Sequence, residues 1–249
     1  MMSSQINFLK PGLLNDETIS SWFSLRNHGS VQPELDIPGL NLGLNTHEEE
    51  KNVLQNRKLL LAEIGLEVHE IAYAIQVHKT NIEVVKHGGT YPNTDAFVTT
   101  ETNLALAIQV ADCAAVLLAD NRNRVIGAAH AGWRGAVENI IPKTVKKMIT
   151  LGAEVKNLKA FISPCISLKN FEVGEEVATQ FSDEFVDREH YEKPHVDLKE
   201  FIRHQLLGQG MMESKIELDT HCTISDERFY SYRRQKEESG RMMGIIKLN

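Results

Sequence analysis

The sequence predicts a single layered α+β domain. Apolar runs of strand length are mixed with amphipathic helical patterns, without the strict alternation of strand and helix that marks a doubly wound fold. The runs in the middle of the chain are continuous, which is typical of strands buried on both faces. With 249 residues and 42% apolar content, the chain can bury one large core. We therefore expect residues 1–249 to form one domain without internal repeats.

The N-terminal part predicts a strand, a loop and a helix. Residues 19–25 form a strand-like run, residues 26–30 a turn, and residues 31–46 a loop rich in proline and glycine. Thr46, with Glu49 three positions later, has the form of a capping box, so we expect the helix to begin there. Gly65 follows the last apolar residue of the helical stripe and is placed to end the helix.

Four apolar runs in the middle of the chain predict buried strands. They cover residues 71–77, 104–112, 114–119 and 125–130. A helical pattern then continues to Gly152, and Pro142 predicts a kink or break within it.

The C-terminal third predicts two helices among short strands. The helical patterns cover residues 174–184 and 198–207, and Asp197 is placed to cap the second. The expected strands cover residues 158–162, 216–218, 229–232 and 243–248. In the third of these, alternation would place Tyr230 and Tyr232 on one face.

Three of the central runs end at a residue able to bind a metal ion, namely His78, Cys113 and His130. If those strands share a sheet and a direction, the three side chains can converge. Three protein ligands with one open position are typical of catalytic zinc, and one thiolate with two neutral imidazoles leaves a net charge of +1 that favours an anionic ligand. The same ligand types also suit blue copper, and a buried cysteine is often only a small apolar residue.

The segment from His130 to Gly135 joins a strand end to a helix N-terminus. Arg134 in the first helical turn would suit a phosphate or carboxylate together with the backbone N–H groups. Stacking of Arg134 on Trp133, or a surface ion pair, is the alternative. We expect Asp112 to bond a neighbouring backbone group or to orient a ligand histidine.

The charge of the chain excludes two classes of partner. A formal net charge of −7 without a clustered basic patch argues against nucleic acid and against an anionic membrane surface. No segment has the form of a signal peptide or a membrane span, and the three widely spaced cysteines fit reduced thiols. We expect a cytoplasmic protein.

With these residues identified, the chain resembles the YfiH family, which is also described as a multicopper polyphenol oxidoreductase or laccase-domain family and as a purine nucleoside phosphorylase family. The resemblance spans nearly the whole chain. The matching segments are residues 40–43, 56–57, 76–78, 95–96, 111–113, 130–135, 164–166, 222–223 and 231–234.

The resemblance implies a YfiH-like fold with mixed β-sheets sandwiched between helices. It implies a catalytic zinc ion held by His78, Cys113 and His130, with Arg134 also catalytic and copper as the alternative metal. The implied reactions are phosphorolysis of adenosine, inosine or methylthioadenosine with phosphate, and deamination of adenosine. The matched segments supply the expected substrate-binding residues, which are Asn41, Arg57, Gln76, Tyr232 and Arg233.

Three loops depart from the family pattern, at residues 27–30, at Ser163 and at Lys79, where the family has glycine. They put the substrate preference in question and leave the metal ligands intact. The alternatives to nucleoside chemistry are a copper-dependent polyphenol oxidase, an amide hydrolase that edits peptidoglycan precursors, and a metal or nucleoside binder without catalysis.

Overall fold

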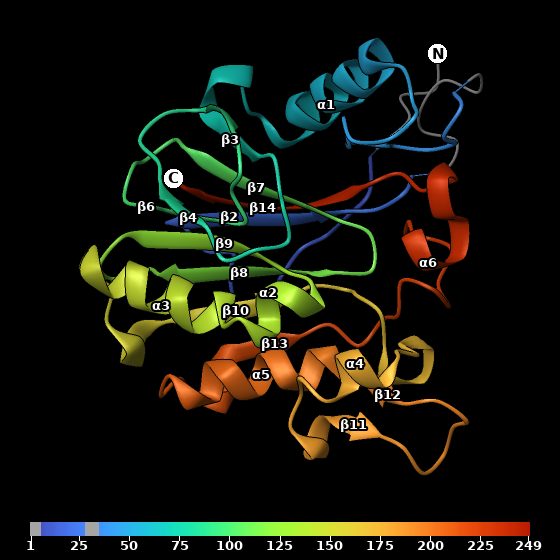
Figure 1. The fold of residues 1–249 in the computed structure, drawn as a ribbon. Coiled ribbons are helices and arrows are strands. Elements are labelled where there is room, and N and C mark those ends of the chain that lie inside the picture. The colour runs from blue at the N-terminus through green and yellow to red at the C-terminus, as the bar shows by residue number, and fades with distance from the viewer. Residues whose placement is uncertain (1–5, 28–34) are drawn as a thin grey trace.

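Two six-stranded sheets stacked face to face form the centre of the molecule (Figure 1). The computed structural model describes residues 6–27 and 35–249. Helix α1 (Glu50–Ile64) covers the outer face of one sheet, and α3 (Ile140–Thr150) and α5 (Leu198–Gly208) cover the outer face of the other. The expected α+β fold of mixed sheets between helices is confirmed. Parts of the expected turn 26–30 and loop 31–46 lie outside the described residues.

The first sheet has the strand order β1-β2-β14-β7-β3-β5. Its strand β3 is parallel to both of its neighbours, whereas β14 is antiparallel to β2 and to β7, so the sheet is mixed. The strands are β1 (Phe8–Leu9), β2 (Ile19–Ser24), β14 (Met242–Leu248), β7 (Ala105–Val110), β3 (Ile71–Ala74) and β5 (Gly89–Tyr91).

The second sheet has the order β13-β10-β8-β9-β6-β4 and is also mixed. Its strands are β13 (Ile216–Leu218), β10 (Lys159–Ile162), β8 (Ala114–Asp120), β9 (Val125–Ala131), β6 (Ala96–Thr99) and β4 (Ile82–Val84). A separate antiparallel pair joins β11 (Val186–Asp187) to β12 (His195–Val196).

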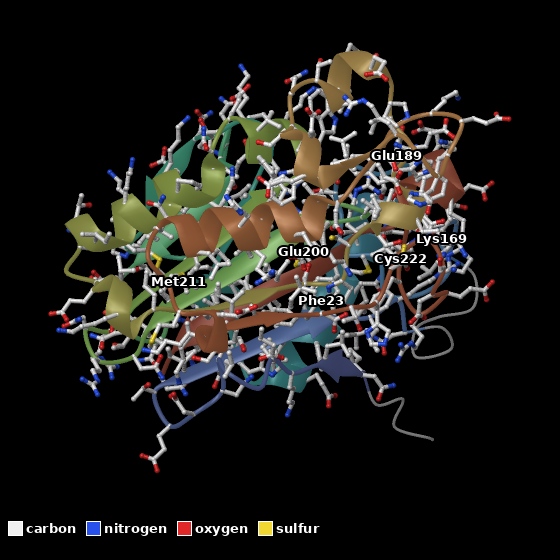
Figure 2. The ribbon with its side chains drawn as sticks, turned by 90° about the horizontal axis from the view of Figure 1, so that it is seen from below. Phe23, Lys169, Glu189, Glu200, Met211 and Cys222 are labelled. Atoms are coloured by element: carbon white, nitrogen blue, oxygen red, sulfur yellow. The ribbon has the colours of Figure 1, made fainter. Side chains whose placement is uncertain are left out.

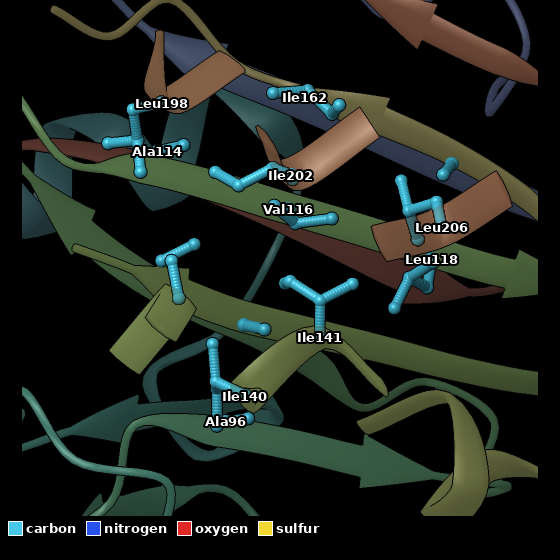
Figure 3. Packing of buried hydrophobic residues seen from close by; sticks show 14 of the residues in the cluster. Ala96, Ala114, Val116, Leu118, Ile140, Ile141, Ile162, Leu198, Ile202 and Leu206 are labelled. Carbon is cyan, nitrogen blue, oxygen red and sulfur yellow. The ribbon is translucent and has the colours of Figure 1, made fainter. Parts of the chain in front are cut away.

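The core lies in three layers because both sheets are covered on both faces. Every residue of β8 and β9 is buried, as their continuous apolar sequence predicts. Between the sheets, Phe23 of the first packs in one cluster with Leu117 of the second. On the outer face of the second sheet, Ile141 of α3 and Ile202 of α5 pack over β8 and its neighbours (Figure 3). In the view from below, α5 crosses this face (Figure 2).

The start of α1 differs from the sequence prediction. The helix begins at Glu50, and the Glu49 side chain makes no capping hydrogen bond, so the predicted capping box is wrong. The Thr46 hydroxyl instead donates to the backbone oxygen of Gly43 and accepts from the Asn41 amide. Gly65 ends the helix in the left-handed conformation, with φ 69°, as predicted.

The predicted helix up to Gly152 is two helices, α2 (Trp133–Val137) and α3. The break lies at Asn139, which has φ 66°, and the predicted break at Pro142 is wrong. Pro142 lies in the first turn of α3, where a backbone N–H has no helical partner and the ring is tolerated.

Two further predictions on the C-terminal side need correction. The predicted strand 229–232 is wrong because Phe229 and Tyr230 are buried outside any strand, and α6 (Tyr232–Gln235) begins after Ser231. The predicted helix 174–184 is limited to α4 (Glu175–Ala178). The Asp197 cap of α5 is confirmed, since its carboxylate accepts from the backbone N–H of Glu200.

Candidate metal centre

His78, Cys113 and His130 converge, but from two sheets rather than one. His78 follows β3 of the first sheet, Cys113 lies in the connection from β7 to β8 that joins the sheets, and His130 is on β9 of the second sheet. Their ligand atoms all lie within 4.8 Å of one another. The prediction that the three side chains leave one shared sheet is wrong. The predicted convergence is confirmed, and it occurs where the two sheets meet.

The backbone at this centre adopts uncommon conformations. His78 has φ 58° and Asp112, next to Cys113, has φ 79°, both in the left-handed region that residues other than glycine rarely adopt. Each such residue costs about 1–3 kcal/mol unless its surroundings compensate. Gly132 also approaches closely, since a Cβ there would lie 2.9 Å from the Cys113 sulfur. The turn after His130 therefore needs glycine for space.

A buried carboxylate, Asp95, holds two of the ligands. It accepts from the backbone N–H groups of His78 and Lys79, each at 2.9 Å, and its Oδ1 lies 3.0 Å from Nδ1 of His130. The side chain of Asp95 is fully buried. With Nδ1–H of His130 donating to the carboxylate, Nε2 is left for a metal ion.

The sequence alone assigned no role to Asp95, although residues 95–96 belong to the matched segments. The only local feature that could have identified it is its position as a carboxylate directly before the buried strand β6. Asp112 was expected either to orient a ligand histidine or to bond a backbone group, and the structure shows a bond to a backbone group. It accepts from the backbone N–H of Arg233 and from the Thr223 hydroxyl, each at 2.6 Å. Asp112 thus ties the C-terminal segment to the turn that carries Cys113.

Without a metal ion, the charges at this centre favour a Cys113 thiolate paired with a protonated His130, and a metal ion would bind by displacing the proton of His130. Burial alone would raise the pKa of the Cys113 thiol, but His130 and His78 outweigh it and lower this pKa to about 6. Burial would lower the pKa of His130, and the Cys113 thiolate and Asp95 raise it to about 9. A thiolate and two imidazoles form a donor set that fits zinc or copper, with room for one more ligand.

A cavity of about 550 Å³ opens onto the three side chains. Four of the five predicted substrate-binding residues line it, namely Arg57, Gln76, Tyr232 and Arg233. The side-chain amide of Gln76 is bonded within the protein. It donates to the backbone oxygen of Gln109 and accepts from the backbone N–H of Gln109, at 2.8 Å each. Gln76 thereby braces the chain leading to His78.

Two predicted site residues do not line the cavity. Asn41 is fully buried, and its side chain bonds Thr46 and accepts from the backbone N–H groups of Gly43 and Arg241. Arg134 is exposed, and its guanidinium carbon lies 4.4 Å from the ring centroid of Trp133, which is the stacking alternative. The catalytic role of Arg134 stays a prediction without a cavity contact.

Arg241 lines the cavity and was missed by the sequence analysis. It donates to the backbone oxygens of Ser239 and Gly240, and its guanidinium lies 5.7 Å from the ring of Tyr232. Burial lowers its pKa. No local pattern marks it, since it precedes a terminal strand that is far from the metal ligands in sequence.

The chain is similar to bacterial proteins named as purine nucleoside phosphorylases, and to solved structures, over most of its length. A purine nucleoside phosphorylase of Deinococcus radiodurans is 37% identical over 215 residues, covering 84% of this chain and 82% of that protein. A purine nucleoside phosphorylase of Corynebacterium glutamicum is 35% identical over 213 residues, with coverages of 83% and 85%.

Two crystal structures share the fold. The hypothetical protein YfiH of Bacillus licheniformis superposes with a TM-score of 0.86 at 28% identity over 93% of both chains. A protein of Neisseria meningitidis gives 0.85 at 30% identity, over 98% of this chain and 99% of that one. These likenesses confirm the resemblance to YfiH.

Comparison of the chain with models of protein families supports the same relationship. Residues 20–249 match the family described as multi-copper polyphenol oxidoreductase laccase, and this match includes all three candidate metal ligands. Among residues 6–27 and 35–249, the helices lack the combination of length and apolar character that a membrane span requires. The chain therefore belongs to the multi-copper polyphenol oxidoreductase laccase family, as a relative of the YfiH proteins.

Proposed function

We propose that this protein is a zinc-dependent purine nucleoside phosphorylase that also deaminates adenosine. Its substrates are adenosine, inosine or methylthioadenosine together with phosphate, and the products of phosphorolysis are the base and ribose 1-phosphate. The observation that carries the proposal is the group of His78, Cys113 and His130 lining a cavity rich in arginine. The names of the bacterial relatives support the substrate class.

His78, Cys113 and His130 would hold the zinc ion, and the ion would supply Lewis-acid chemistry to that part of the cavity. Three ligands with an open fourth position support zinc, whereas a blue-copper site usually adds an axial methionine, and no methionine is among the described residues that line the cavity. The low pKa of Cys113 keeps the thiolate ready to bind at neutral pH.

The side chains of the cavity suit a nucleoside and an anion. Arg233 and Arg241 bring positive charge to the cavity, where a phosphate would be neutralised. The aromatic side chains of Trp133 and Tyr232 also line it and offer flat apolar surfaces to a purine. A volume of about 550 Å³ lies within the range of small-molecule sites.

The decisive experiment incubates zinc-loaded protein with adenosine, with and without phosphate, and identifies every product. Adenine and ribose 1-phosphate that form only with phosphate establish phosphorolysis, and inosine establishes deamination. The Cys113→Ala variant should lose zinc and both activities, whereas Cys222→Ala, which changes a thiol outside the metal-binding group, should keep them.

Four results would overturn the proposal. The first is full phosphorolysis by Cys113→Ala. The second is an intense blue absorption band with stoichiometric copper and turnover of phenols, which would establish the oxidase. The third is cleavage of a peptidoglycan nucleotide precursor without any action on nucleosides. Adenosine binding without product would indicate a binder that lacks catalysis.

A further inference from the structure

One part of the cavity lies between α1 and the first sheet. Tyr73 on β3 pairs in register with Ala107 on β7, and Gln109 is two residues further along β7, so both side chains leave the same face of the sheet. That face packs against α1, because Tyr73 and Ala107 share a core cluster with Leu60. Arg57 is on the same helix, and Arg57, Tyr73 and Gln109 all line the cavity.

These three side chains carry polar groups that the protein leaves unpaired. Arg57 is only 6% exposed, and its Nε donates to the backbone oxygen of Leu42 at 2.9 Å. Its two terminal nitrogens have neither a hydrogen-bond partner nor a carboxylate among the described residues. The hydroxyl of Tyr73 and the Oε1 atom of Gln109 are buried and also lack a partner within that part of the chain.

Arg57 lines the cavity without a counter-charge among the described residues, so this arrangement favours an electron-rich ligand. The Arg57 guanidinium lies 4.3 Å from the ring of Tyr73, and burial lowers its pKa while Tyr73 only partly compensates. Burial raises the pKa of Tyr73, so its hydroxyl stays protonated and able to donate. The Gln109 amide has a defined orientation, since its Nε2 donates to the backbone oxygen of Ala74 and leaves Oε1 as an acceptor.

We propose that Arg57, Tyr73 and Gln109 form a subsite that binds the N1–H and C6=O edge of a 6-oxopurine base. The guanidinium donates toward O6 and N7, the pair of acceptors that arginine reads on guanine in DNA. The Tyr73 hydroxyl offers a second donor to O6, and Oε1 of Gln109 accepts the N1–H. This inference rests on the proposed function for the purine class, and it makes inosine a better substrate than adenosine.

Adenine and phosphate fit this subsite less well. In adenine the 6-amino group is a donor facing the guanidinium of Arg57, and N1 is an acceptor facing Oε1 of Gln109, so both contacts reverse. A site built to hydrogen-bond a substrate rejects an analogue that leaves its polar groups unpaired. Phosphate could accept hydrogen bonds from Arg57 and Tyr73, but its oxygens would face Oε1 of Gln109, which is also an acceptor and repels them.

The test measures binding without turnover. Calorimetry on the zinc-loaded protein gives the dissociation constants of hypoxanthine, adenine and inorganic phosphate separately. We expect hypoxanthine to bind about tenfold or more tightly than adenine. Tyr73→Phe removes one buried oxygen and should weaken hypoxanthine about fivefold, with little effect on adenine.

Two matched variants control for nonspecific effects. Tyr91→Phe removes a hydroxyl that donates to the backbone of His87, and neither Tyr91 nor His87 lines the cavity, so both base affinities should stay unchanged. Gln109→Leu should bring the affinities of hypoxanthine and adenine together, whereas Gln180→Leu, on an exposed side chain, should not. Circular dichroism confirms that each variant is folded.

Several results would overturn the subsite. They are equal affinities for hypoxanthine and adenine, no binding of either base, or a loss of phosphate affinity alone in Tyr73→Phe, which would identify an anion site. The outcome is separable from that of the proposed function. If the base discrimination holds and no phosphorolysis occurs, the catalytic proposal fails and the subsite stands.

Discussion

Asp95 links the two histidines of the candidate metal centre, although they belong to different sheets. Its carboxylate holds the His78 backbone in a left-handed conformation and also orients the His130 ring. Such carboxylates raise the basicity of a metal-bound imidazole and hold its orientation. The role of Asp95 at this centre is therefore to position the ligands.

Asp95→Asn should weaken zinc binding by about 10- to 100-fold, because the ring of His130 loses its charged acceptor. Competition with a chromophoric chelator measures the affinity. Asp187→Asn is a matched control, since Asp187 makes the same contact with the exposed His190 far from the metal ligands. An unchanged zinc affinity in Asp95→Asn would remove Asp95 from this role.

Gly132→Ala tests the space around the ligands. The added Cβ would lie 2.9 Å from the Cys113 sulfur and 3.3 Å from Cδ2 of His78, so both ligands must shift. We expect zinc affinity to fall about tenfold or more, in line with other changes beside metal ligands. Gly208→Ala has open space around its Cβ and should leave zinc binding intact. Zinc content after dialysis distinguishes the two.

At the scale of elements, the helix ends show which local sequence patterns were sufficient to predict where a helix begins or ends. Asp197 caps α5 through a 3.1 Å bond from the backbone N–H of Glu200, and Gly65 ends α1, both as the sequence predicts. Thr46 has the residue type of a cap, yet its hydroxyl bonds Asn41 and Gly43. Competing partners three and five residues earlier in the loop occupy the Thr46 hydroxyl, so the residue type alone does not identify the cap.

Asp197→Ala should lower the free energy of unfolding by about 1 kcal/mol, the usual effect of losing an N-cap. Urea denaturation measures the change. Glu63→Ala, at an exposed position on α1, should change the stability by less than about 0.5 kcal/mol. A loss in Asp197→Ala no larger than in this control would mean that the cap bond contributes nothing to stability.

At the scale of the whole molecule, the metal ligands connect the two sheets. His78 comes from the first sheet, His130 from the second, and Cys113 from the chain that passes between them. An ion that binds this folded arrangement and not the unfolded chain stabilises the native state. Metal binding at this candidate centre would therefore be linked to the packing of the sheets.

Removal of zinc by a chelator should lower the Tm of the protein. At a free zinc concentration 1,000 times the dissociation constant, the ion contributes about 4 kcal/mol to stability. Differential scanning calorimetry with and without the chelator measures the shift. The Cys113→Ala variant should melt at the same temperature in both conditions, and a wild-type Tm that does not respond to the chelator would contradict the linkage.

The sequence by itself determined the residue types of the metal centre and most buried strands, because continuous apolar runs and the family motifs are local patterns. His78, Cys113 and His130 were identifiable for this reason. The break at Asn139 and the absence of a strand at Phe229 and Tyr230 were not, since tertiary contacts override local propensity there.

Only the tertiary structure decided how the parts meet. It placed the candidate metal ligands between two sheets, brought Asp95 to these ligands and brought Arg241 to the cavity. It also left Arg134 stacked on Trp133 and not among the residues that line the cavity. These contacts join residues far apart in the chain, and their geometry depends on the packing of whole sheets. A local sequence pattern carries no information on that packing.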